Sequence, residues 1–336
     1  MKIRKVQIEN YKVFKDFEID FTSEDKALPL VVIAGVNGSG KSTLFNAMHF
    51  SASDNGFKEA VKMQFEDREK GSVVYYPIFD DQVVHTKKVL TEYIDKLVYE
   101  EDLKSSEAYA RVQQMLDTLF DGFGMQVHLG GVSASREIFF KTPAGERIAI
   151  ESLSRGEQQV ITKAFSLYLS DIHDSIVLID EPEMSLHPSW QSKIGTVYQQ
   201  FAEAYNNQII LSTHSPQVVS SVRREQVRVL LKEDDGSIRV ISDFSGSYGW
   251  RIDRILLEIF GVQQLRVKAV EDELHHLNEL LEQEAYDAPE FQEKMARLED
   301  LLGYADPDLA LLRLEAEEQR MEKEACADDE TDDETE

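Results

Sequence analysis

The fold is decided by the stretch Gly35-Val36-Asn37-Gly38-Ser39-Gly40-Lys41-Ser42-Thr43. It matches the phosphate-loop pattern G-x-x-x-x-G-K-[ST] at every fixed position. Small residues in this pattern let successive backbone N–H groups curl around phosphates, and the helix that follows adds favourable partial charge at its start. We expect Lys41 to reach the β and γ phosphates of ATP, and Ser42 to offer its hydroxyl to Mg²⁺. The stretch therefore predicts a nucleotide site between an apolar strand at 30–34 and a helix.

Two apolar runs farther along the chain end in residues that suit phosphate chemistry. Residues 176–179 are followed by Asp180 and Glu181, and residues 209–211 lead to His214. Short apolar runs bounded by polar residues are typical of buried central strands. The carboxyl ends of parallel strands meet at the edge where α/β sheets bind ligands. We therefore expect Asp180 to hold Mg²⁺ and Glu181 to polarise the attacking water.

A further segment, Leu153-Ser154-Arg155-Gly156-Glu157, resembles the signature motif of ABC-type ATPases, usually written LSGGQ, with Arg in the third place and Glu in the fifth. In that class the signature of one subunit closes on the γ-phosphate bound by the other. The resemblance implies that the Ser154 hydroxyl and the Gly156 amide face ATP bound by a second copy of the chain. It also implies Glu181 as catalytic base and His214 as the switch histidine that senses the γ-phosphate.

Two remaining elements of this class are assigned by the same resemblance. Residues 184–188, Met-Ser-Leu-His-Pro, fall where the D-loop crosses the dimer interface. The Q-loop glutamine, expected beside Mg²⁺, is assigned to Gln82, which follows the apolar stretch 73–77. Gln64 remains an alternative for that position.

Composition limits what else the chain can be. Its 336 residues, 42% of them hydrophobic, suffice for one large α/β domain and a smaller appendage. The single cysteine, Cys326, excludes an internal disulfide and a cysteine zinc site. The first residues lack the apolar core of a signal peptide, and no apolar run approaches the roughly 20 residues of a membrane span. We expect a cytoplasmic protein without a membrane partner.

The pattern along the chain predicts an α/β fold over residues 1–262, and the resemblance implies that this domain is an ABC-type P-loop ATPase head with a mixed sheet. Apolar alternation near 3–8 and 14–21 predicts an antiparallel strand pair, and 227–231 with 238–240 predicts a terminal hairpin. Helical spacing predicts a helical lobe at about 86–122. The start of the chain around Asn10-Tyr11-Lys12 resembles the RecF, SMC and OLD branch of these ATPases.

Beyond residue 262 the pattern becomes helical and acidic. Residues 263–322 predict a helical hairpin with an apolar face and a third short helix near 309–320, and residues 323–336 predict a disordered acidic tail. Segment 265–336 holds 25 acidic and 7 basic residues, which places −18 of the net charge of −27 there. DNA-binding domains normally show a basic face, so this charge does not indicate DNA. A small basic cluster, for which a solvated helix face is favoured, leaves DNA as an alternative partner: Lys58, Lys62, Arg68 and Lys70.

The ordered set of motifs resembles the stand-alone ATPases of prokaryotic antiphage systems, the OLD-like and Septu PtuA-like group, in which the sequence from Glu181 to Pro188 is characteristic. The stretch after His214 shows no acid-bearing strand pattern of the Toprim nuclease domain that OLD proteins carry. The resemblance thus implies a Mg-ATP-dependent ATPase that dimerises head to tail and regulates a separate effector, a nuclease being favoured. The alternatives are a RecF-like DNA-repair ATPase and, less favoured, the nucleotide-binding subunit of a transporter.

Overall fold

The computed structural model describes residues 1–53, 60–66, 72–77, 82–125, 128–133, 135–142, 144–168 and 172–333. The chain divides into two compact units, Met1–Gly261 and Val262–Glu336. The sequence places this boundary between residues 262 and 263. Within the described ranges, no helix combines the length and the apolar character needed to cross a bilayer.

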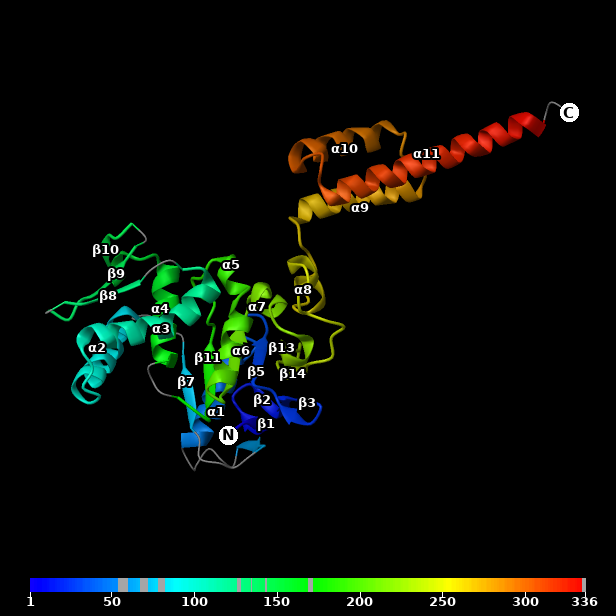
Figure 1. The fold of residues 1–336 in the computed structure, drawn as a ribbon. Coiled ribbons are helices and arrows are strands. Elements are labelled where there is room, and N and C mark those ends of the chain that lie inside the picture. Colours follow the sequence, from blue (N-terminus) through cyan, green and yellow to red (C-terminus); the bar gives the residue numbers. More distant parts are fainter. Residues whose placement is uncertain are drawn as a thin grey trace. The chain divides into compact units, whose positions relative to one another are not determined.

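A six-stranded sheet lies at the centre of the first unit, in the order β14-β13-β5-β12-β11-β7 (Figure 1). Its neighbouring strands pair in parallel except for the antiparallel hairpin of β13 and β14, so the predicted mixed sheet and terminal hairpin are confirmed. Every residue of β5, β11 and β12 is buried, as expected for parallel strands covered on both faces. The strands are β5 (Leu30–Ala34), β7 (Val73–Tyr76), β11 (Ile176–Asp180), β12 (Gln208–Thr213), β13 (Val227–Lys232) and β14 (Ile238–Ile241).

The strand register brings the predicted motifs to one edge of this sheet. Thr213, the last residue of β12, pairs with Ala34, the last residue of β5. Asp180, the last residue of β11, pairs with Ser212. The phosphate loop after Ala34 and the residues after Asp180 and Thr213 therefore leave from adjacent strand ends.

Each face of the central sheet has its own core because successive strand residues point to opposite sides. Val31 and Ile33 of β5 join a core with α1 (Lys41–Ser53) and a small antiparallel sheet. That sheet has the order β2-β1-β6, and it includes the predicted strand pair. Its strands are β1 (Ile3–Tyr11), β2 (Phe14–Asp20) and β6 (Val61–Phe65), with a short ribbon of β3 (Thr22–Ser23) and β4 (Lys26–Ala27) nearby in sequence.

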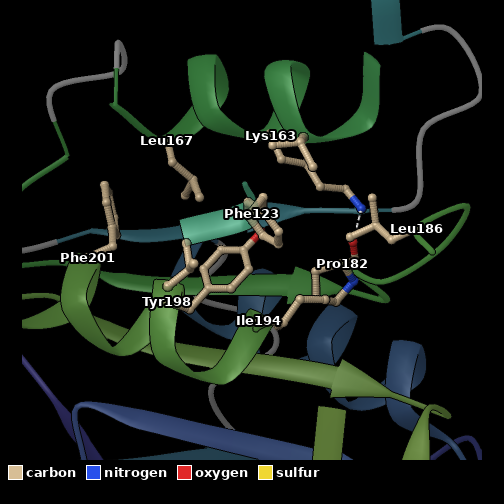
Figure 2. Close-up of a pocket in the computed structure, with 10 residues that line it drawn as sticks. Phe123, Lys163, Leu167, Pro182, Leu186, Ile194, Tyr198 and Phe201 are labelled. Atoms are coloured by element: carbon tan, nitrogen blue, oxygen red, sulfur yellow. Dashed lines mark hydrogen bonds between the residues drawn. The ribbon is translucent and has the colours of Figure 1, made fainter. Parts of the chain in front are cut away.

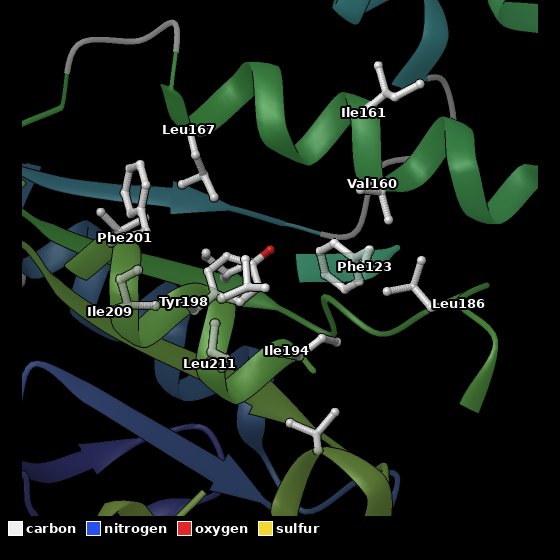
Figure 3. Packing of buried hydrophobic residues seen from close by; sticks show 14 of the residues in the cluster. Phe123, Val160, Ile161, Leu167, Leu186, Ile194, Tyr198, Phe201, Ile209 and Leu211 are labelled. Atoms are coloured by element: carbon white, nitrogen blue, oxygen red, sulfur yellow. The ribbon is translucent and has the colours of Figure 1, made fainter. Parts of the chain in front are cut away.

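The opposite face of the sheet is covered by helices. Leu30 and Val32 of β5 belong to a core that also contains Phe123, Leu167 and Phe201. Figure 3 shows how side chains from facing helices interdigitate there over β12. The helices around this core are α2 (Gln82–Tyr99), α3 (Ser105–Phe123), α4 (Arg155–Tyr168), α5 (Pro188–Gln191), α6 (Ile194–Ala204), α7 (Pro216–Ser220) and α8 (Ile252–Glu258), with single 3₁₀ turns η2 (Ile150–Ser152) and η3 (Arg224–Gln226).

The predicted helical lobe at 86–122 corresponds to α2 and α3, but it carries a sheet that the sequence did not predict. This meander, of order β10-β9-β8, comprises β8 (His128–Val132), β9 (Ile138–Lys141) and β10 (Arg147–Ala149). Its strands are three to five residues long, and β8 contains Gly130 and Gly131, where the register shifts. Such short, glycine-interrupted strands give almost no alternation to detect.

As far as Asp333, where the described residues end, the second unit has three helices, α9 (Lys268–Glu282), α10 (Pro289–Leu302) and α11 (Pro307–Asp333). They share a core of their own that includes Leu277, Tyr286 and Leu298. The predicted apolar hairpin thus closes with its third helix into a small bundle. Helix α11 continues to Asp333, through part of the segment for which the sequence predicts disorder. The side chain of Cys326 lies outside the described part.

Candidate nucleotide-binding site

The phosphate loop is closed so tightly that two of its glycines cannot be replaced without movement. A Cβ on Gly35 would lie 2.6 Å from Ser39 Oγ and 2.7 Å from Leu230 O. Gly40 has φ 94°, in the region that favours glycine, and a Cβ there would lie 3.1 Å from Phe14 Cζ. The turn between β1 and β2 therefore packs against the phosphate loop and holds in place the backbone N–H groups that would surround a phosphate.

Lys41, the first residue of α1, is buried and points into this loop. Its Nζ donates to Gly35 O at 2.8 Å and to Val36 O at 3.2 Å. Burial lowers the pKa of Lys41, while the carboxylates of Glu181, Asp180 and Glu183 act in the opposite direction. The ammonium group thus lies between the loop and the acidic strand ends, where a polyphosphate would replace the carbonyl oxygens as its partner.

Ser39 and Ser42 offer hydroxyls of two different kinds. Ser39 is buried, and its Oγ has no hydrogen-bond partner among the described residues. Ser42 is exposed at the start of α1. A buried unpaired hydroxyl inside a loop of small residues fits a phosphate oxygen, which would supply the missing partner.

Asp180 is held in one orientation by two hydroxyls. Ser212 Oγ donates to its Oδ1, and Tyr75 OH donates to its Oδ2 at 3.3 Å. Burial, reinforced by the charge of Asp180, raises the pKa of Tyr75, so the phenol remains a donor. Carboxylate and hydroxyl oxygens are donors that Mg²⁺ accepts, usually with one or two carboxylates, phosphates and water. Asp180 and Ser42 therefore suit Mg²⁺, while Tyr75, hidden in the apolar stretch 73–77, was missed by the sequence reasoning.

Glu181 and His214 meet directly. His214 Nδ1 lies 3.2 Å from Glu181 Oε1. Glu181 has φ 44°, an uncommon conformation for a residue other than glycine. Its backbone N–H donates to Ser212 Oγ at 3.1 Å, which helps to hold it there. The structure thus brings together the predicted catalytic base and the predicted switch histidine.

A second acid, Glu183, supports this pair and was not predicted. Its side chain is 2% exposed. Its Oε1 accepts from Thr213 Oγ1 at 2.5 Å and from His214 N at 3.1 Å. Burial raises the pKa of Glu183, and its Oε2 has no partner among the described residues. The spacing Glu-Pro-Glu was visible in the sequence, but nothing there indicated that the second carboxylate faces inward.

The predicted signature forms the N-terminus of α4. Ser154 N donates to Glu157 Oε2 at 2.8 Å, and Glu157 N donates to Ser154 Oγ at 3.2 Å. This reciprocal pair is a capping box, which explains why Glu is accepted in the fifth place of the motif. Ser154 and Arg155 are exposed. Gly156 faces the segment 184–188, since a Cβ there would lie 3.2 Å from Trp190 Cζ3 and 3.4 Å from Ser185 O.

Two other predicted features are only partly described. Gln82 is the first residue of α2, but its side chain lies outside the described part, so its role remains a prediction. The alternative, Gln64, is an exposed residue of β6 opposite Lys5, in the antiparallel sheet. Of the basic cluster, Lys62 pairs with Glu9 at 2.5 Å. Lys58, Arg68 and Lys70 lie outside the described residues.

Comparisons with known proteins agree with this geometry. A family model described as AAA ATPase domain matches residues 1–76, and one described as AAA domain, putative AbiEii toxin, Type IV TA system matches residues 75–220. The solved SmcHead bound to the C-winged helix domain of ScpA has the same fold, with a TM-score of 0.52 and 14% identity over 73% of this chain and 98% of that chain. The two AAA-domain matches meet at residues 75–76, so together they span residues 1–220.

Curated relatives of the chain are larger proteins. A retron Vc95 probable ATPase from Vibrio cholerae is 35% identical over 117 residues, 31% of this chain and 22% of that protein. A Septu protein PtuA from Bacillus mycoides is 22% identical over 344 residues, 83% of this chain and 46% of that protein. The chain therefore matches less than half the length of either relative.

Proposed function

We propose that the chain hydrolyses Mg-ATP in two composite sites formed by a head-to-tail dimer. The observation that carries this proposal is that Ser154 and Arg155 lie exposed at the N-terminus of α4. A helix N-terminus presented at the surface by a serine is suited to a phosphate brought by another molecule. In each site one subunit supplies the phosphate loop with Asp180 and Glu181, and its partner supplies residues 154–157.

The residues of one chain divide the chemistry between them. Lys41 neutralises charge on the β and γ phosphates, and Ser42 with Asp180 holds Mg²⁺, which polarises the phosphoryl group when bound. Glu181 orients the attacking water and accepts its proton. His214 contacts Glu181 and hydrogen-bonds the γ-phosphate. It therefore connects Glu181 to the γ-phosphate only while ATP is intact.

For the biological role, we propose that the dimer regulates a separate effector in a prokaryotic antiphage defence system, with a nuclease as the favoured effector. Sequence similarity to a Septu PtuA and to a retron ATPase supports this role. The second unit, a small helical bundle with an acidic exterior, is suited to contact another protein. ATP and ADP can bias such a contact only through the different subunit arrangements that they stabilise.

Glu181→Gln and Lys41→Ala test the composite site. Glu181→Gln keeps the shape of the side chain but cannot accept the proton from water. Turnover should therefore fall at least about 100-fold, and with ATP the variant should stay dimeric, as detected by native mass spectrometry. Lys41→Ala should lose ATP binding and remain monomeric. Lys232→Met, at the exposed end of β13, serves as a control that behaves like wild type. Unchanged turnover in either site variant would refute the site.

The effector is tested by tagged capture from the native host, with wild type and Glu181→Gln compared by mass spectrometry. A stoichiometric nuclease or toxin-like protein, retained in one nucleotide state, supports the regulatory role. Retention of DNA alone by an isolated dimer would replace it with a role in DNA repair.

A further inference from the structure

A lysine outside the predicted site connects the signature helix to the catalytic segment. Lys163 lies on α4, nine residues after Ser154, which corresponds to about 14 Å along a helix. Its Nζ donates to Pro182 O at 2.5 Å. Pro182 stands between Glu181 and Glu183. Figure 2 shows the lysine side chain extending from α4 across the gap to this carbonyl.

The segment Glu181–Glu183, which contains the proposed catalytic base, is thereby held from two sides. Ser212 on β12 binds the backbone N–H of Glu181, and Thr213 and His214 bind Glu183. These contacts come from β12 and from His214, the residue directly after it. Lys163 contributes a hydrogen bond from α4, and it acts at the carbonyl next to the residue with the uncommon φ of 44°. A small shift of α4 would therefore be transmitted to the backbone that aims Glu181.

Packing alone does not account for a charged side chain at position 163. The cavity it enters is lined mostly by apolar side chains. Burial lowers the pKa of Lys163 to about 8, although Glu183 and Glu181 oppose the shift. An unbranched apolar residue would fill this space without the desolvation cost, so the stability of the fold does not explain a lysine here.

We propose that Lys163 is a positioning residue that couples the two ATP sites of the dimer. When Ser154 closes on the ATP of the partner, α4 takes up a fixed position, and Lys163 sets the Glu181 segment that acts on the ATP of its own subunit. Each site thus becomes fully competent only when the other is occupied. This inference rests on the proposed function, because it requires that residues 154–157 contact ATP held by the partner.

Lys163→Met in the full-length chain tests the coupling. Methionine has a similar length and fits an apolar cavity, but it cannot donate to Pro182 O. Turnover of wild type against ATP concentration should give a Hill coefficient approaching the limit of about 2 set by two coupled sites. In Lys163→Met we expect a coefficient of about 1 and a maximal rate lowered about 10-fold to 100-fold, since a small misplacement of a catalytic group has this effect.

Two further measurements separate positioning from a purely structural role. Affinity for a fluorescent ATP analogue and the melting temperature should be unchanged or higher in Lys163→Met, with Lys232→Met as the matched control. Wild-type cooperativity together with an equally cooperative, equally fast Lys163→Met would overturn the inference and leave the proposed function standing. If Glu181→Gln forms no dimer with ATP, the proposed function fails, and the coupling fails with it.

Discussion

Lys163→Met should also change the free energy of unfolding, and this effect does not depend on the proposed function. Burial shifts the pKa of Lys163 from 10.5 to about 8. At 1.36 kcal/mol for each pKa unit, this corresponds to about 3 kcal/mol that the folded state loses by keeping the ammonium buried. Below pH 8 lysine is protonated in both states and this cost is complete. Between pH 8 and 10.5 only the unfolded chain retains the proton, so the free energy of unfolding of wild type rises with pH.

Methionine has no such cost, but its variant loses the hydrogen bond to Pro182 O, worth about 1 kcal/mol. We therefore expect Lys163→Met to be more stable than wild type by about 2 kcal/mol at pH 7 and slightly less stable near pH 10.5. Urea unfolding of both proteins at several pH values between 7 and 10.5, followed by fluorescence of Trp190 in a Trp250→Phe background, measures the difference. Other groups titrate equally in both proteins and cancel. A stability difference independent of pH would refute the reasoning.

Three further predictions concern separate parts of the molecule. Gly40→Ala should lower ATP affinity at least about 10-fold in a titration, because its left-handed φ and the contact with Phe14 force the phosphate loop to move; unchanged affinity would contradict the tight cradle. Glu157→Ala should lower stability by about 1 kcal/mol in urea unfolding by removing half of the capping box with Ser154, whereas Glu157→Gln should cost much less. Leu277→Ala, in the core of the second unit, should destabilise that bundle by about 2–5 kcal/mol, seen as early exchange of its amides, while basal ATP turnover persists; loss of turnover would show that the two units depend on each other.

Much of the first unit could be predicted because its signals are local. The runs at 30–34, 176–179 and 209–211 contain only apolar residues, which is typical of central strands buried on both faces. The short meander at 128–149 could not be predicted in the same way, since its strands carry too few alternating residues. The core of the second unit could be predicted only in part, because the pattern of a helical hairpin does not show that a third helix completes that core.

The sequence by itself determined the chemistry of the phosphate loop, the acids after β11 and the capped start of α4, because each depends on neighbours within a few residues: glycine φ angles, a helix N-terminus, a Ser-x-x-Glu spacing. Only the tertiary structure decided how these parts are aimed. Tyr75 on Asp180, Thr213 on Glu183 and Lys163 on Pro182 join segments separated by 105, 30 and 19 positions. Such contacts depend on the order and register of strands and on the packing of a helix over them, and no local pattern in the chain encodes that arrangement.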